Sequence, residues 1–172
     1  SKIVSDLSTH AAATQTIFSL GNEDVLYIED CELATSAATL MNVTSDTNVA
    51  IINSTLKTTN SGTAYVVKST GSSAAVTVLN STLKCEGTTS TSSACIYSEN
   101  TLSLDIHGDK TLFEVSAGTA TIFAKNGGLT ANVYGGKFIG NGGSCSAIRT
   151  SDNSTVNIYD GYFESDGSSA IT

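Results

Sequence analysis

The chain has 172 residues, of which 40% are hydrophobic, and its 8 basic and 16 acidic side chains give a formal net charge of −8. This length fits one domain with a continuous core, so we expect a single domain over residues 1–172. The acidic balance argues against nucleic acid and anionic membrane surfaces as partners, and no apolar run is long enough for a transmembrane helix.

The composition and the start of the chain bear on its setting. The chain begins Ser-Lys-Ile-Val without an initiator Met or a signal peptide, so we expect it to be part of a longer chain or of an assembly. Its Ser-, Thr- and Asn-rich, Lys-poor composition favours an extracellular or cell-surface location, where cysteines are able to oxidise.

One eight-residue pattern recurs along the chain. In order, it reads LYIEDCEL from Leu26, VAIINSTL from Val49, VTVLNSTL from Val76, LDIHGDKTL from Leu104 with one extra residue, ANVYGGKF from Ala131 and VNIYDGYF from Val156. Its second apolar position, the anchor, falls at Ile28, Ile51, Val78, Ile106, Val133 and Ile158. The anchor spacings are 23, 27, 28, 27 and 25 residues, with a mean of 26. A regular period of this length indicates a solenoid.

Each copy predicts a strand followed by a sharp bend. Apolar residues alternate with other residues around each anchor, which is the period of two of a β-strand. Two residues after the anchors stand Asp30, Asn53, Asn80, Gly108, Gly135 and Asp160. Because Gly, Asn and Asp visit left-handed backbone conformations most readily, we expect a positive φ at this corner in every coil.

In every coil, the pattern of a small residue, any residue and an apolar residue predicts a second strand. The pairs are Ala38/Leu40, Ala64/Val66, Ala94/Ile96, Ala120/Ile122, Ser146/Ile148 and Ser169/Ile171. The arc from this strand to the next anchor is nearly constant in length, whereas the arc that leads to it varies by six residues. Variable arcs are typical of loops, so we expect contacts with other molecules there.

The repeat therefore predicts an all-β solenoid of about six coils with a mean of 26 residues. The spacings are not multiples of six, as a left-handed hexapeptide helix needs, and the Ser/Thr/Gly-rich remainder of each coil lacks the helix formers of a leucine-rich repeat. Through its YGGKF and YDGYF segments the chain resembles the right-handed parallel β-helix of pectate-lyase-like and adhesin-like surface repeat proteins. This resemblance implies an architecture and hardly any activity.

We expect no catalytic residue, cofactor or metal site. Lyases and hydrolases of the fold that the chain resembles combine clustered Asp with Arg or Lys, whereas the carboxylates here are scattered and Arg149 is the single Arg. His10 and His107 have no partner nearby in sequence. The cysteines form no C-x-x-C motif and have no His at ligand spacing, which argues against zinc. The outward column Tyr27, Ala50, Thr77, Asp105, Asn132 and Asn157 is too mixed for an ice-binding face.

Two kinds of covalent modification stay open. Cys85 and Cys95 bracket the longest variable arc and are candidates for a disulfide, with free buried thiols as the alternative for all four cysteines. Asn42, Asn53, Asn80 and Asn153 each open an N-x-[ST] sequon and are candidates for N-glycosylation. Asn53 and Asn80 also lie in the predicted corner column, where Asn has a backbone reason to occur.

The leading functional hypothesis is a non-catalytic extracellular structural or adhesive module, such as part of a stalk, a surface layer or a filament. Open β-helix ends present strand edges that need partners, so we expect self-association through them or continuation of the same chain. The alternative is a carbohydrate-active enzyme or glycan-binding module, for which Tyr134, Tyr159 and Tyr162 are the candidate glycan contacts.

Overall fold

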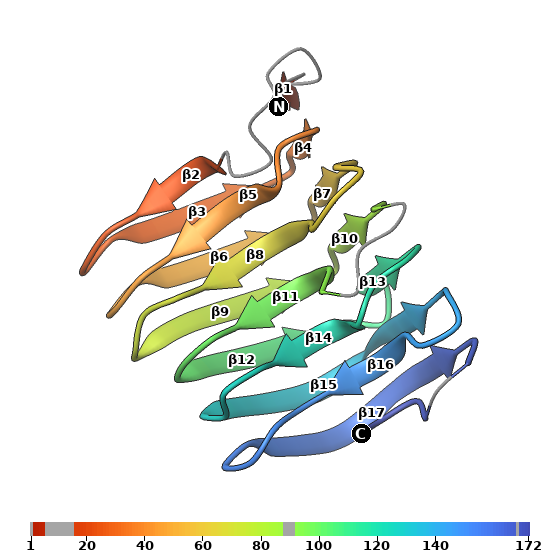
Figure 1. Ribbon diagram of the computed structural model, residues 1–172. Helices are drawn as coiled ribbons and strands as arrows, with labels where there is room; N and C mark the ends of the chain where they lie inside the picture. The colour runs from red at the N-terminus through yellow and green to blue at the C-terminus, as the bar shows by residue number, and fades with distance from the viewer. Residues whose placement is uncertain (1, 6–15, 88–91, 168) are drawn as a thin grey trace.

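The computed structural model describes residues 2–5, 16–87, 92–167 and 169–172 (Figure 1). Parallel strands stack as a β-solenoid of about six turns, with roughly 26 residues between turns, which confirms the predicted fold class. No helix occurs among these residues, and consequently none that is long and apolar enough to cross a membrane.

Each full coil contains three strands, and strands in the same position of successive coils form a face of the rod. The first face carries the anchors and consists of β3 (Val25–Glu29), β6 (Asn48–Ile52), β9 (Ala74–Leu79), β12 (Leu102–His107) and the first parts of β15 (Leu129–Gly140) and β17 (Thr155–Ser165). In Figure 1 these strands lie behind those of the third face. Every pairing between them is parallel.

The other two faces follow in chain order. The second face consists of β1 (Lys2–Ser5), β4 (Glu32–Thr35), β7 (Thr55–Thr58), β10 (Thr82–Cys85), β13 (Leu112–Val115) and the last parts of β15 and β17. The third face consists of β2 (Thr16–Leu20), β5 (Thr39–Val43), β8 (Tyr65–Ser69), β11 (Ala94–Ser98), β14 (Ala120–Ala124) and β16 (Ser146–Arg149). Because β15 and β17 run on across the corner, the first two faces form one sheet.

The anchors stack in one unbroken column, as predicted. The register pairs Ile28 with Ile51, and the column continues through Val78, Ile106, Val133 and Ile158. The first five are buried, whereas Ile158 in the last coil is 42% exposed. The register of the solenoid therefore follows directly from the sequence repeat.

A second inward column lies on the second face. It comprises Leu33, Leu56, Leu83, Phe113, Phe138 and Phe163. The rings of Phe113 and Phe138 stack with their centroids 5.0 Å apart, and those of Phe138 and Phe163 are 4.8 Å apart. Stacked parallel strands lie about 4.8 Å apart, so rings of the same orientation on neighbouring coils meet face to face.

The predicted third-face column is wrong by one residue in its first two coils. Met41 and Val67, not Leu40 and Val66, are in register with Ile96, Ile122, Ile148 and Ile171. Leu40 and Met41 are both buried, because the side chains of this strand do not alternate strictly between inside and outside. Two adjacent apolar residues leave a period of two ambiguous, which explains the error.

The corner column is confirmed in the first four coils. Asp30, Asn53, Asn80 and Gly108 have φ values of 50°, 46°, 47° and 87°. In the last coil the prediction for Asp160 is wrong, because Gly161 has the positive φ of 142° instead. In the coil before it, the strongly left-handed residue is Gly136, with φ of 105°, rather than the predicted Gly135, whose φ is 159°.

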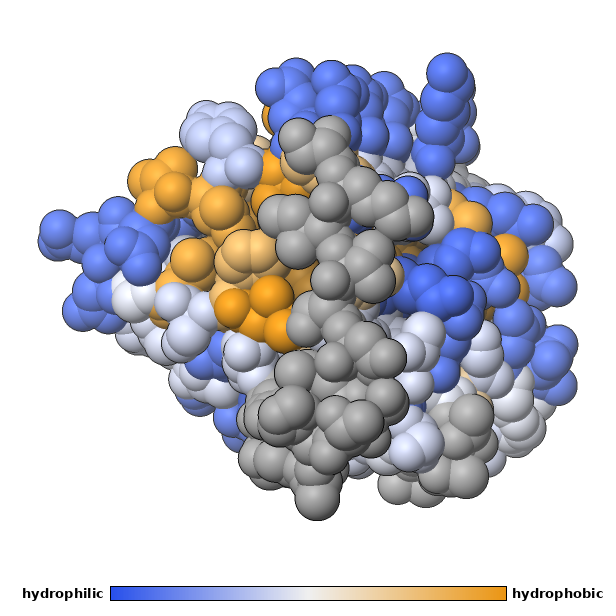
Figure 2. Space-filling model, turned by 90° about the horizontal axis from the view of Figure 1, so that it is seen from above, coloured by the Kyte–Doolittle hydropathy of each residue, from blue (hydrophilic) through white to orange (hydrophobic). Residues whose placement is uncertain are grey.

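The lengths of the connections also match the sequence pattern. Connections from the third face to the first contain three to five residues, whereas from β4 onward those from the second face to the third contain three to eight. At the end of the rod that carries β2 and β3, hydrophobic side chains are grouped at the surface (Figure 2). On β3, Val25 and Tyr27 are exposed.

The corner geometry predicts a specific sensitivity at Gly108. A Cβ added there would lie 2.0 Å from Asn80 Oδ1, at a φ of 87°. We expect Gly108→Ala to lower the free energy of unfolding by about 1–3 kcal/mol, because a left-handed backbone is unfavourable for residues with a side chain. Urea denaturation measures the loss.

Gly143→Ala is the matched control, because a Cβ at Gly143 meets nothing within 4 Å. It should change the free energy of unfolding by no more than about 0.5 kcal/mol. Equal losses for the two variants would contradict the assigned corner.

The anchor column predicts a graded response to truncation. Ile51 is fully buried, so Ile51→Ala should cost about 2–5 kcal/mol. Ile158→Ala should cost clearly less in the monomer, since its side chain is 42% exposed. Denaturation curves at a protein concentration that keeps the chain monomeric test this order, and a larger loss at Ile158 would overturn it.

Candidate functional site

All four cysteines are free thiols in the structure, which is the second of the two states that the sequence left open. Cys85 Sγ donates a hydrogen bond to the carbonyl oxygen of Ala64 at 3.2 Å. One coil earlier, the hydroxyl of Thr58 donates to the carbonyl of Ala37 in the equivalent position. Cys85 therefore replaces a hydroxyl of the core. Cys95 Sγ contacts the carbonyl oxygen of Leu83 at 3.1 Å in the same manner.

Three of the thiols are buried and Cys31 is half-buried. Burial raises the pKa of the Cys85 thiol to about 12 and that of Cys145 to about 11, and it raises the pKa of Cys95 as well. Since the thiolate is the reactive form, a raised pKa lowers reactivity at neutral pH.

The native chain should therefore react with Ellman's reagent at pH 8 through one thiol, Cys31, and through all four only after denaturation. The slow thiols should react faster as the pH rises, because a raised pKa moves thiolate formation to higher pH. Cys31→Ser should abolish the fast phase, whereas persistence of that phase in the variant would show that a core thiol is accessible.

Two of the candidate glycosylation sites belong to a corner motif. Asn53 and Asn80 have the left-handed backbone of the corner, and the serines that follow them are buried. The hydroxyl of Ser54 donates to the carbonyl of Ile52, and that of Ser81 to the carbonyl of Leu79. The N-S-T triplets at these two positions thus have a structural explanation that needs no glycan.

The other two sequons lie apart from this motif. Asn42 is half-buried on β5, in register with Lys68. Asn153 is exposed in the turn before β17, with φ of 61°. Among the four sequon residues, Asn53 and Asn153 are the exposed ones.

The candidate glycan contacts divide into two groups. Tyr134 and Tyr159 stack with centroids 4.7 Å apart and ring planes at 4° to each other. His107 continues the column, with its ring 4.6 Å from that of Tyr134. In such a column each ring covers the face of its neighbour, so these residues present mainly ring edges to the side of the rod. His10 lies outside the described residues.

Tyr162 lies on the other side of the corner, in a concave region that we call the corner groove. It is lined by Asp109, Gly135, Gly136, Lys137, Asp160, Gly161 and Tyr162 and has a volume of about 370 Å³. These residues come from three successive coils, so the groove runs along the rod. Lys137 Nζ lies 4.9 Å from the centroid of the Tyr162 ring, within the range of a cation–π contact.

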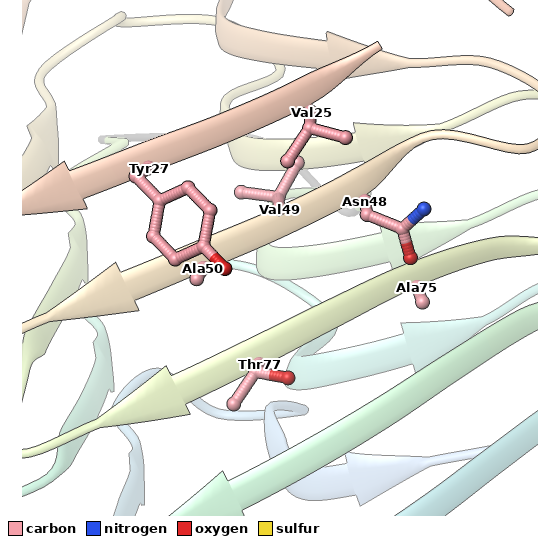
Figure 3. Close-up of a pocket in the computed structure, with 7 residues that line it drawn as sticks. All are labelled: Val25, Tyr27, Asn48, Val49, Ala50, Ala75 and Thr77. Carbon is pink, nitrogen blue, oxygen red and sulfur yellow. The ribbon is translucent and has the colours of Figure 1, made fainter. Parts of the chain in front are cut away.

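The first face has a smaller depression near the other end of the rod. Figure 3 shows Tyr27 on β3 beside Ala50 on β6, with Ala75 and Thr77 on β9. The depression measures about 190 Å³, and Tyr27 is 71% exposed. The depression exists because Ala50 and Thr77, which follow Tyr27 in register on β6 and β9, have small side chains. The sequence placed Tyr27 in the outward column but assigned it no role.

The third face carries an aromatic cluster that sequence reasoning missed. Tyr65 and Tyr97 stack with centroids 4.5 Å apart, Phe123 meets Tyr97 edge-on, and Lys68 Nζ lies 5.8 Å from both tyrosine rings. Burial, together with the Glu99 carboxylate, raises the pKa of Tyr65 to about 12. A groove of about 630 Å³ beside this cluster is lined mainly by threonines and by Asn42. Lys68, Tyr97 and Phe123 occupy the same position in successive coils, and this position in the repeat could have predicted that they stack.

Several charged and amide side chains pair between neighbouring coils. Asn132 Nδ2 donates to Asp105 Oδ1 at 2.8 Å, and Asn157 Nδ2 donates to Asn132 Oδ1 at 2.9 Å. Ion pairs join Lys57 to Glu86, Lys68 to Glu99 and Lys84 to Glu114. Within the described ranges, no three His, Cys, Asp or Glu side chains are grouped so that they could hold a metal ion.

Comparison of the chain with known protein families, characterised proteins and solved structures finds no match. The solenoid fold therefore stands on the structure alone, and the resemblance to pectate-lyase-like and adhesin-like proteins stays a prediction.

Proposed function

We propose that the chain is a non-catalytic structural module of an extracellular or cell-surface solenoid, such as a stalk, a surface layer or a filament, of the adhesin-like kind. The observation that carries this proposal is the continuous parallel pairing of strands from coil to coil, with similar apolar residues stacked on one another in the core. A ladder of this kind resists bending because every coil is bonded to both neighbours along three faces.

The contacts between coils support a load-bearing role. Three ion pairs join neighbouring coils at the surface, with N–O distances of 2.6 Å for Lys57–Glu86, 2.8 Å for Lys84–Glu114 and 3.4 Å for Lys68–Glu99. Because these side chains are about one third exposed, each pair contributes less than about 1 kcal/mol. Most of the cohesion therefore comes from the inward columns and the backbone bonds.

The last coil supports association along the axis. Val133 is fully buried under β17, whereas its neighbour in the column, Ile158, is 42% exposed. Tyr159, Tyr162 and Ile171 are also exposed in this coil. An edge strand of eleven residues with apolar side chains is a template for a further strand. We propose that a further coil, from a second copy or from the same protein, covers it.

Sedimentation and electron microscopy of the 172-residue chain across salt and protein concentration test this proposal. The average mass should rise with concentration, and it should rise further with salt, since screening weakens the repulsion between chains of charge −8. Images should show rods that lengthen in units of one subunit.

Two variants on β17 separate axial association from nonspecific sticking. Ile158→Lys places a charge in the open core and should abolish the rise in mass. Thr155→Lys adds the same charge at an outward position of the same strand and should leave association intact. A chain that stays a 17.6 kDa monomer under all conditions would overturn the proposal of axial association.

The second candidate is a carbohydrate-active enzyme or glycan-binding module, and the corner groove is the observation that favours it. A reducing-sugar assay on acidic polysaccharides separates catalysis from a structural role. If the chain degrades such a polymer and Asp105→Asn or Asp109→Asn removes that activity, the structural proposal is wrong.

A further inference from the structure

The corner groove differs from the other corners of the rod because side chains are missing from its floor. At the earlier corner between β9 and β10, the Asn80 side chain lies over Gly108, with Oδ1 2.0 Å from where a Cβ would be. In the last two coils, Gly135, Gly136 and Gly161 leave bare backbone instead. A Cβ at Gly136 would come within 3.1 Å of the carbonyl oxygen of Thr111, so the turn itself excludes larger residues.

Three charged side chains, two carboxylates and one ammonium, converge on this floor. Asp109 Oδ1 lies 3.4 Å from the Cβ position of Gly135, so the carboxylate stands directly over the floor. Asp160 contributes a second carboxylate, of which Oδ1 accepts a hydrogen bond from Gly161 N at 2.7 Å. Lys137 contributes an ammonium donor. A concave site with a few convergent polar groups is the usual form of a small-ligand site.

Tyr162 supplies an aromatic wall. Tyr162 is 54% exposed, and Lys137 Nζ lies over its ring, 4.9 Å from the centroid. The Tyr162 hydroxyl donates to Glu164 Oε2 at 3.0 Å, which holds the ring in place. An anchored and exposed ring beside carboxylate acceptors offers C–H contacts and hydrogen bonds to the same ligand.

We propose that the corner groove binds a neutral saccharide that lies along the rod, with Asp109 and Asp160 accepting hydrogen bonds from ring hydroxyls and Tyr162 packing against a sugar ring. Two carboxylates against one ammonium leave a local charge of −1, which disfavours acidic sugars. The groove spans three coils, so it offers room for more than one sugar unit. This site goes beyond the structural role. Tyr162 lies on β17, the strand that a further coil would cover, so binding is measured at a protein concentration that keeps the chain monomeric.

A glycan array of neutral and acidic oligosaccharides, followed by titration of the strongest binder, tests the proposal. Isothermal titration calorimetry measures the affinity, because five other tyrosines of the chain would contribute to a fluorescence signal. We expect binding of neutral oligosaccharides and at least a tenfold loss of affinity in Tyr162→Ala and in Asp109→Asn.

Matched controls lie elsewhere on the same rod. Tyr27→Ala removes an exposed tyrosine at the other end, and Asp46→Asn removes an exposed carboxylate from the turn between β5 and β6, where Asn accepts the same positive φ. Both should keep full affinity, and unchanged circular dichroism should show that all four variants are folded. The proposal is overturned if no neutral glycan binds, if acidic glycans bind more tightly, or if Tyr162→Ala binds as the parent does.

Discussion

The parallel backbone register is the constraint on which the rest of this molecule depends. Once Ile28 is placed over Ile51, every other residue of a coil lies over a fixed partner in the next coil at the strand spacing of about 4.8 Å. The phenylalanine stack inside and the tyrosine stack outside are both consequences of this spacing. So are the amide ladder from Asp105 to Asn157 and the ion pairs between coils.

The corners convert this register into a closed coil. A left-handed residue turns the chain, and in two coils a buried serine after it bonds the carbonyl of the strand that has just ended. Where two glycines replace this motif, the strand continues through the corner and the surface is left hollow. Turn chemistry thus decides both the path of the chain and the place where a ligand has room to approach.

Much of the architecture was predictable because the repeat encodes it twice, in the apolar period and in the corner residues. All six anchors and four of the six corner residues fell where expected. Prediction failed by one residue where two neighbouring residues suit the same position. Leu40 and Met41 are both apolar, and Asp160 and Gly161 both tolerate a positive φ. The corner groove was not predictable, because it arises from residues of three coils whose outward surfaces meet only after the turns are formed. The sequence had marked Gly135 and Asp160 as corner residues and Tyr162 as an aromatic side chain near the C-terminal coils, but nothing in it placed the three in one groove.

The unequal connections between strands have a consequence for how such a rod changes length. The connections vary in length at all three corners, and most in the turns from the second face to the third, while the strands of successive coils stay in parallel register. Each coil touches only its neighbours. Duplicating or removing one complete repeat would therefore alter the reach of the molecule in steps of one strand spacing while leaving both junctions intact. The number of repeats therefore sets the length of the rod, and the spacing of hydrogen-bonded strands sets the size of each step.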